Sequence, residues 1–256
     1  MSLSSLEWHN RFSQQSTWTL ELRNYLFSRA GLDTSKRVLD VGCGTGAVKV
    51  DFKPETSFIF HGLDINYNFL NITRLNLPFA CLTQGDGHAL PFASKMFDIV
   101  FCHYLLLWVA DPLKVISEMV RITRNGGSVL ALAEPDYGGR IDFPHQLEHL
   151  GYLQTQALKI QGADVNMGRK LGQIFSNAGM EEIEIGILGG QWHKPLSQQE
   201  IELEWTVLRS DLVHFREYNL SEEALLVLQR IDSTAWENRE RILFVPTFYA
   251  WGRVPE

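Results

Sequence analysis

The chain has 256 residues, of which 45% are hydrophobic and 21% charged, and its formal net charge is −7. This composition is typical of a single α/β domain with a sizeable core. The negative charge disfavours broad binding to phosphate backbones, so we expect no nucleic-acid partner. The longest apolar runs are too short to cross a bilayer, so we expect no membrane partner either. The oligomeric state is left unknown.

Three cysteines, Cys43, Cys81 and Cys102, do not suggest a disulfide framework. The first residues lack the basic and long apolar regions of a secretion signal. Both observations favour a reducing compartment, and we expect a cytoplasmic protein.

Residues 6–30 are expected to be helical, because apolar side chains recur there at helical spacing and Gly31 supplies a stop. The stripe is largely aromatic and includes Trp8, Phe12 and Trp18. It either docks the helix onto the rest of the domain or forms a flap over a ligand.

Residues 38–46 read VLDVGCGTG, and the rest of the chain is organised around them. The apolar residues predict a buried parallel strand over 36–41. The alternate glycines predict a strand-to-helix turn where the backbone approaches a ligand closely, with a short helix over 47–52. Asp40 would repel a pyrophosphate, which disfavours a nicotinamide-dependent reductase. The same carboxylate suits a ligand that carries an ammonium group and hydroxyls.

The string DVGCGTG closely resembles the cofactor loop of class I S-adenosylmethionine-dependent methyltransferases. The resemblance implies a Rossmann-like α/β fold. Its seven-stranded, mostly parallel sheet would have an antiparallel last strand, helices on both faces and a helical cap over the active site. It also implies S-adenosylmethionine as cofactor, bound by Asp40, Gly42, Cys43, Gly44 and Gly46, and it suggests that Arg11, Phe12 or Gln14 reaches the site.

The second expected strand, residues 57–63, ends at Asp64, which lies 18 residues after Gly46. An acid at this place in a βαβ unit reaches the ribose hydroxyls of an adenosine ligand. The family resemblance assigns Asp64 the same task, with Ile65 against the adenine face and Asn66 supporting the ribose. A solvated turn acid is the alternative. A helix is expected over 66–76.

The third expected strand, residues 79–84, precedes GDGHALPF, which resembles the family's G-D-A-x-x-L-P-F element. The resemblance implies that Asp86 accepts a hydrogen bond from the adenine amino group, since a carboxylate only accepts. The backbone from Gly87 onward would meet the ring edge. His88 either borders the adenine or faces solvent.

The fourth and fifth strands are expected over 96–102 and 128–133, with Pro112 opening a helix between them. The resemblance places Cys102 and His103 near the sulfonium. Strand-end matches to the family cover residues 36–136.

The whole chain is read as one methyltransferase domain, 1–256. It consists of an N-terminal helical segment (1–35), a cofactor-binding half (36–136) and a substrate half with a helical cap (137–256). In the last part we expect helices over 146–162, 168–178, 196–211 and 221–239. Strands are expected over 181–192 and 241–254, the second interrupted by Pro246. Glu134, Asp136 and Tyr137 either orient a substrate or are ordinary loop residues.

Residues 145–149 read HQLEH and match the H-x-x-E-H zinc motif literally. No convincing third ligand accompanies them, so we expect no metal. His145 and His149 more plausibly line the substrate cavity or face solvent. With His103 they are the candidate catalytic bases, needed if the methyl acceptor is a hydroxyl.

The function expected from these residues is methyl transfer from S-adenosylmethionine to a small-molecule acceptor by in-line displacement. A protein that binds S-adenosylmethionine as a regulator or sensor, without methyl transfer, is the alternative. The substrate, the accepting atom (oxygen, nitrogen or carbon) and the use of a general base stay open.

Overall fold

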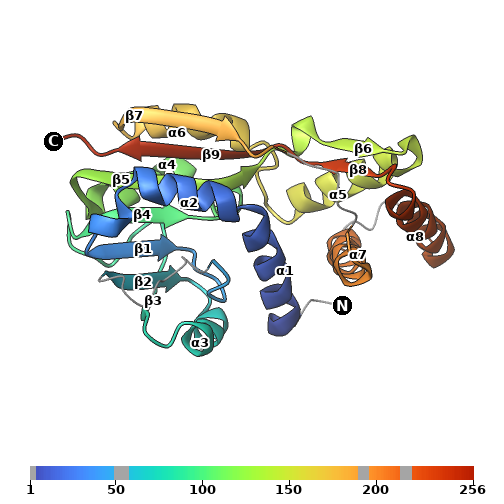
Figure 1. Cartoon of the computed structure of the whole chain (residues 1–256), viewed down its shortest axis with the longest axis horizontal. Coiled ribbons are helices and arrows are strands. Elements are labelled where there is room, and N and C mark those ends of the chain that lie inside the picture. Colours follow the sequence, from blue (N-terminus) through green and yellow to red (C-terminus); the bar gives the residue numbers. More distant parts are fainter. Residues whose placement is uncertain (1–3, 49–57, 190–195, 214–220) are drawn as a thin grey trace.

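The computed structural model describes residues 4–48, 58–189, 196–213 and 221–256. The molecule is elongated, with a large sheet in one half and a smaller group of helices around a two-stranded ribbon in the other (Figure 1). Helix α1 (Ser5–Trp18) stands between the two halves. We call the smaller half, residues 140–160, 198–213 and 221–244, the cap.

The large sheet has seven strands in the order β3-β2-β1-β4-β5-β9-β7. Strand β9 is antiparallel to both of its neighbours, and the other adjacent pairs are parallel. The sequence-based expectation of a seven-stranded sheet with an antiparallel last strand is confirmed. The strands are β1 (Arg37–Val41), β2 (Ile59–Asp64), β3 (Cys81–Gln84), β4 (Phe97–Cys102), β5 (Thr123–Pro135), β7 (Glu181–Ile187) and β9 (Thr247–Arg253).

Helices cover both faces of this sheet. On one face, Leu26 and Phe27 of α2 pack against Phe101 and Trp251. On the other, α4 and α6 share a core with Val100 and Val129. In the described ranges no helix has both the length and the apolar character that crossing a membrane requires. The remaining helices are α2 (Leu20–Arg29), α3 (Tyr67–Asn76), α4 (Pro112–Ile122), α5 (Glu148–Ile160), α6 (Leu171–Asn177), α7 (Gln198–Val213) and α8 (Glu222–Glu237).

Three predicted elements differ from the structure. The N-terminal helix is interrupted at Thr19, whose φ of −103° and ψ of 3° separate α1 from α2. The predicted last strand is two strands, because Pro246 leaves a gap between β8 (Ile242–Phe244) and β9. Strand β8 pairs with β6 (Ile141–Phe143), a strand too short to show a pattern in the sequence. The helix predicted over 47–52 lies mostly outside the described residues, and Ala47 and Val48 are not helical.

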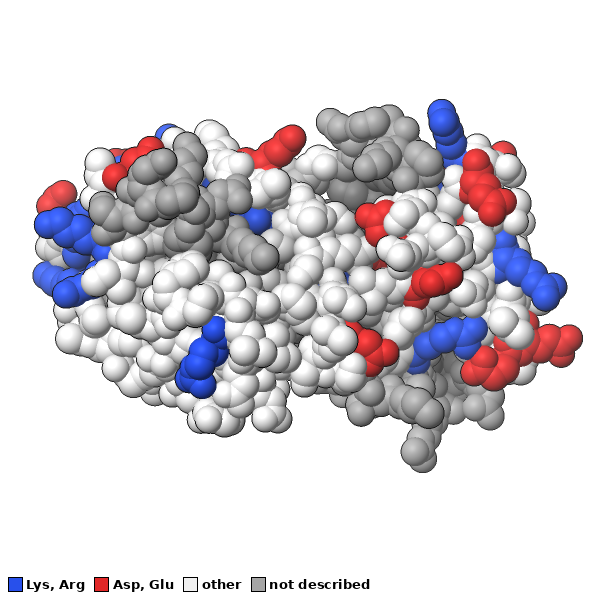
Figure 2. All heavy atoms as spheres, turned by 60° about the horizontal axis from the view of Figure 1, so that its bottom comes forward, with Lys and Arg blue, Asp and Glu red and all other residues white. Residues whose placement is uncertain are grey.

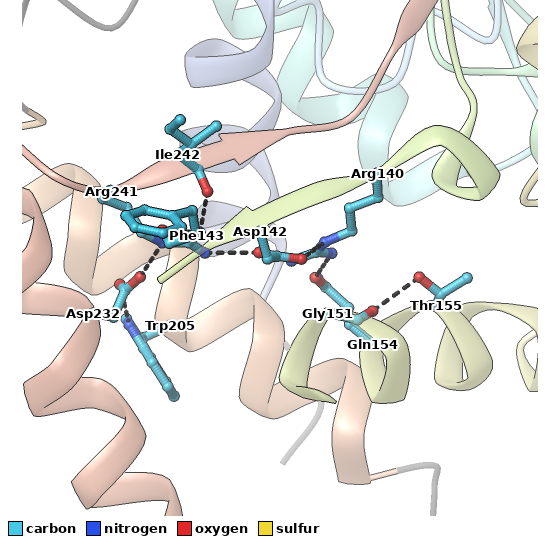
Figure 3. A network of polar contacts seen from close by, with 10 residues as sticks. All are labelled: Arg140, Asp142, Phe143, Gly151, Gln154, Thr155, Trp205, Asp232, Arg241 and Ile242. Carbon is cyan, nitrogen blue, oxygen red and sulfur yellow. Dashed lines mark hydrogen bonds and ion pairs between the residues drawn. The ribbon is translucent and has the colours of Figure 1, made fainter. Parts of the chain in front are cut away.

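A chain of buried ion pairs holds the cap together (Figure 3). Asp142 accepts from Arg140 Nε at 2.6 Å and from Arg241 Nη2 at 2.9 Å. Arg241 Nε also donates to Asp232 at 2.6 Å, and Asp232 accepts from Trp205 Nε1 at 2.9 Å. The network therefore ties β6 and β8 to α7 and α8. It lies beside a separate apolar cluster to which Leu150, Trp205 and Leu225 belong.

Gly151 makes room for this network in the middle of α5. A Cβ at this position would lie 2.0 Å from Asp142 Oδ2, which is far inside contact distance. Glycine is unfavourable in a helix interior by roughly 1 kcal/mol relative to alanine. The close approach of the Asp142 carboxylate explains its presence here.

Glu134, near the end of β5, fixes the loop that follows β4. Its fully buried carboxylate accepts from the backbone N–H groups of residues 105, 106 and 107 at 2.8–3.1 Å. Tyr104, just before these donors, has a φ of +52°, an uncommon value for a bulky side chain. Burial raises the pKa of Glu134 to about 8, although the three N–H groups act in the opposite direction. Glu134 is thus a support of the loop, and its side chain is not directed to a substrate.

We expect Asp142→Ala to lower the free energy of unfolding of the cap by about 3–5 kcal/mol, because it leaves Arg140 and Arg241 buried without their shared partner. Urea unfolding followed by tryptophan fluorescence would measure the change. Glu182→Gln, which breaks the more exposed pair with Arg253, should cost less than about 1 kcal/mol. Equal effects of the two changes would contradict a structural role for the buried network.

The raised pKa of Glu134 predicts a pH dependence of stability. The folded state holds the proton more tightly than the unfolded state, so this stabilisation is complete below the ordinary carboxyl pKa. It is lost as the pH rises from there through about 8. Glu134→Gln cannot ionise. The free energy of unfolding of this variant, relative to that of the original chain, should therefore increase as the pH rises. Unfolding curves between pH 5 and 9 would test this, and parallel curves would contradict it.

Candidate functional site

The glycine loop, residues 42–46, follows β1 and forms the tight turn that its alternate glycines predict. Gly42, Gly44 and Gly46 have φ values of +77°, +53° and +72°, which other residues rarely adopt. The N–H groups of Gly42 and Cys43 both donate to Leu63 O, at 2.7 and 3.0 Å, and so fix the loop to the end of β2. The loop turns tightly at the carboxyl ends of parallel strands, where ligands of open α/β sheets bind.

Asp40 lies at the base of this loop and is almost completely buried, with 1% of its surface exposed. Among the described residues its Oδ1 atom has no hydrogen-bond partner. Burial raises its pKa well above the ordinary value, the nearby Asp64 carboxylate raises it further, and the Arg23 guanidinium opposes both. A buried carboxylate oxygen without a donor is costly unless a ligand supplies one.

Asp64 ends β2 and faces the same loop. Its Oδ2 accepts from Gly44 N and its Oδ1 from Asn66 N, each at 2.8 Å, while burial raises its pKa. Asn66 caps α3 by accepting from the N–H groups of residues 68 and 69. Ile65 between them is 68% exposed, an apolar side chain left open at the mouth of the site. Asp40 and Asp64 thus lie at the glycine loop, while the cofactor-binding role of these residues and of Ile65 stays a prediction.

Asp86 follows β3, the strand next to β2, and Gly85 N donates to Asp64 O at 3.1 Å. The Asp86 carboxylate is exposed and accepts from both the N–H and the ring Nδ1 of His88, which lowers its pKa. His88 Nε2 accepts from Asp111 N at 3.3 Å, so the ring is held between two loops. Gly87 packs close to Val41 and Val115, at the end of β1 and in α4. The carboxylates of residues 40, 64 and 86 therefore lie at or just beyond the carboxyl ends of three adjacent strands.

The two cysteines predicted in the site are buried, and burial raises the pKa of both thiols. Cys43 Sγ would be 2.9 Å from a Cβ placed on Gly62, so this side chain faces the sheet. Neither thiol is therefore prepared to act as a nucleophile. Their proposed part in cofactor binding belongs to the backbone.

His103, directly after β4, is buried, and its Nε2 lies 3.0 Å from Thr19 Oγ1. Burial, assisted by the charge of Arg23, lowers its pKa to about 3. The imidazole is consequently neutral at any physiological pH. The contact ties the junction between α1 and α2 to the end of β4, which gives His103 a positioning role.

The other two candidate bases, His145 and His149, are exposed on the surface of the cap. His149 stacks on Tyr152 with a ring distance of 6.2 Å. The structure does not place these two histidines among the buried groups at the strand ends. Within the ranges that the structure covers, no three His, Cys, Asp or Glu side chains gather in a way that could hold a metal ion.

The N-terminal segment contributes more to the site than its sequence shows. His9 Nδ1 lies 2.8 Å from Thr45 Oγ1 in the glycine loop. The Phe12 ring would lie 3.5 Å from a Cβ on Gly44. Arg23, buried near Asp40 and His103, was not predicted, because the sequence pointed only to the aromatic stripe and to Arg11, Phe12 or Gln14. The sequence did carry a signal for Arg23, because a charged residue lies there within the apolar stripe that packs on the sheet.

Comparison with known proteins agrees with this geometry. Residues 39–131 match the model of a methyltransferase domain family. The chain is 31% identical over 150 residues to an uncharacterized methyltransferase of Schizosaccharomyces pombe, covering 53% of each protein. It is 30% identical over 122 residues to a demethylmenaquinone methyltransferase of Renibacterium salmoninarum, covering 47% of this chain and 51% of the relative. The chain thus spans about half the length of these curated relatives.

Among solved structures, the fold is similar to phosphoethanolamine N-methyltransferase 2 of Haemonchus contortus in complex with S-adenosyl-L-methionine. The TM-score is 0.59 at 16% identity, and the similarity covers 92% of this chain and 53% of that one. The matched residues 39–131 contain β1, the glycine loop and the first two strand-end acids after it. The family match thus identifies a methyltransferase domain in residues 39–131, and the chain shares the fold of this solved methyltransferase.

Proposed function

We propose that this protein transfers a methyl group from S-adenosylmethionine to a small organic acceptor. The observation that carries the proposal is the buried, unpartnered oxygen of Asp40, which lies beside the glycine loop and near Asp64. The ammonium group of the methionine tail is the donor that this oxygen lacks. The relatives named as methyltransferases support the same activity.

The other residues of the site fit the remaining parts of S-adenosylmethionine. Asp64 is suited to accept from the ribose hydroxyls, since its two oxygens already face the loop and its charge strengthens hydrogen bonds. Ile65 offers an exposed apolar surface to an adenine face. Asp86 can accept from the adenine amino group, because its pKa is lowered and it stays ionised.

Bound S-adenosylmethionine supplies an electrophilic methyl group whose transfer leaves a neutral thioether, so no acid is needed for the leaving group. What the protein must do is align the acceptor and exclude water. His103, with a pKa of about 3, is a weak proton acceptor at neutral pH. We therefore propose that His103 holds the α1–α2 junction against β4 and does not serve as the general base.

Asp64→Asn keeps the size of the side chain but removes its charge. We expect it to weaken binding of S-adenosylhomocysteine by about 1–3 kcal/mol, measured by titration calorimetry. Asp33→Asn is the matched control, because Asp33 is exposed in the turn that precedes β1. An unchanged affinity of Asp64→Asn would remove this residue from the site.

The raised pKa of Asp40 makes cofactor binding depend on pH. A ligand ammonium binds the ionised carboxylate, so the affinity for S-adenosylhomocysteine should increase as the pH rises through the raised pKa of Asp40. Asp40→Asn should bind more weakly and lose this dependence. The measurement is calorimetry over pH 5 to 8, and an equal slope in both proteins would contradict the assignment.

Methyl transfer itself is tested by adding S-adenosylmethionine and the small-molecule fraction of a cell extract to the purified protein. Release of S-adenosylhomocysteine that depends on the extract supports the proposal. Tight cofactor binding without release over a broad set of extracts would favour the regulatory or sensor alternative.

A further inference from the structure

A groove of about 710 Å³ runs between α1 and α7, on the side where α1 separates the sheet from the cap (Figure 1). Both helices open on a serine and a glutamate that bond each other's backbone, Ser4 with Glu7 and Ser197 with Glu200. The lining of the groove is mostly polar and comes from both helices and their first turns. It consists of Glu7, Asn10, Ser13, Gln14, Thr17, Ser197, Gln199, Glu200, Glu202, Leu203 and Thr206.

Gln14 differs from the other lining residues in two ways. Its side chain is only 8% exposed, and only one of its two polar atoms has a hydrogen-bond partner. Oε1 accepts from Arg11 Nη1 at 2.9 Å, whereas Nε2 has no hydrogen-bond partner among the described residues. A buried amide N–H₂ without an acceptor destabilises the protein. A ligand oxygen in the groove would supply what is missing.

Gln14 is linked through its partner Arg11 to residues that follow the central strands. Arg11, the partner of Gln14, forms an ion pair with Glu204 of α7. The same guanidinium interacts electrostatically with Tyr104, just after β4, and with Tyr137, just after β5. Five residues from four parts of the chain thus connect the groove to the ends of the central strands.

The charges around this groove exclude an anionic ligand. Of the groove residues that the structure describes, three are glutamates and none is a lysine or arginine. The guanidinium of Arg11 is already neutralised by Glu204. Figure 2, which views the molecule from the lower side of Figure 1, shows the sheet half of this face largely without charge. A carboxylate or phosphate on the acceptor would meet no unpaired cation among the lining residues that the structure describes.

We propose that the groove between α1 and α7 admits the methyl acceptor, and that Gln14 recognises an oxygen of an uncharged acceptor through its free amide N–H₂. Arg11 and Glu204 position Gln14, and Arg11 links it electrostatically to Tyr104 and Tyr137 after the central strands. The inference rests on the proposed function, because only a methyltransferase needs an acceptor beside these strands. It adds the charge class of the acceptor and one specificity-determining residue.

The test uses the full chain saturated with S-adenosylhomocysteine and two probes of similar size, uncharged 4-methoxyphenol and anionic 4-hydroxybenzoate. Ligand-observed NMR titration measures their dissociation constants. We expect the uncharged probe to bind at least about ten times more tightly. Gln14→Met should weaken its binding about five-fold, the loss of one hydrogen bond, and leave the affinity for S-adenosylhomocysteine unchanged.

Gln15→Met is the matched control, since it makes the same change one position along the same helix, on a different face. Gln14→Glu is the second variant. It keeps an acceptor for Arg11, replaces the N–H₂ donor with a charged carboxylate oxygen, and should weaken binding of the uncharged probe as well. Undetectable binding of 4-methoxyphenol, equal binding of the two probes, or equal effects at positions 14 and 15 would overturn the proposal.

Failure of the two proposals can be distinguished. If S-adenosylhomocysteine does not bind but 4-methoxyphenol still separates Gln14→Met from Gln15→Met, the groove assignment stands and the methyltransferase proposal fails. If S-adenosylhomocysteine binds and the probe does not separate the variants, the groove assignment alone fails.

Discussion

The site depends on a close approach of like charges. The fold brings the Asp40 and Asp64 carboxylates to the carboxyl ends of adjacent strands. Burial of Asp40 and the charge of Asp64 both raise the pKa of Asp40. Arg23 compensates only in part, since its contact with the backbone of Ser16 and with Thr19 occupies part of its guanidinium. An arrangement of this kind is stabilised by a positively charged ligand. Sites of binding are where proteins accept such a local cost.

The residues around the cofactor loop were predictable because they act through local backbone geometry. Alternate glycines require positive φ values, and an acid directly after an apolar strand must lie at the edge of the sheet. Asp40, Gly42, Gly44 and Asp64 follow these rules and are brought together by the fold. The seven-stranded sheet with its antiparallel last strand followed from the family resemblance that these motifs carry.

The contacts between distant segments could not be predicted in the same way. His103 contacts Thr19, and Glu134 accepts from the loop after β4, through hydrogen bonds between residues many positions apart. Arg23 interacts electrostatically with both His103 and Asp40. No spacing in the sequence encodes such pairs. The H-x-x-E-H string shows that a local pattern with good spacing need not mark a site, because its two histidines lie on the exposed surface of the cap. Strand β6 was missed since three residues cannot display a period.

Helix α1 has a consequence for how the two ligands affect each other. Its His9 and Phe12 contact the glycine loop, while Arg11 and Gln14 on the same helix border the groove toward α7. When one ligand orders α1, the conformational entropy of the helix is already lost. A second ligand that binds the other side then loses less entropy on binding. If the cofactor and the acceptor bind as proposed, we expect their affinities to be linked with positive cooperativity that needs no movement of the sheet.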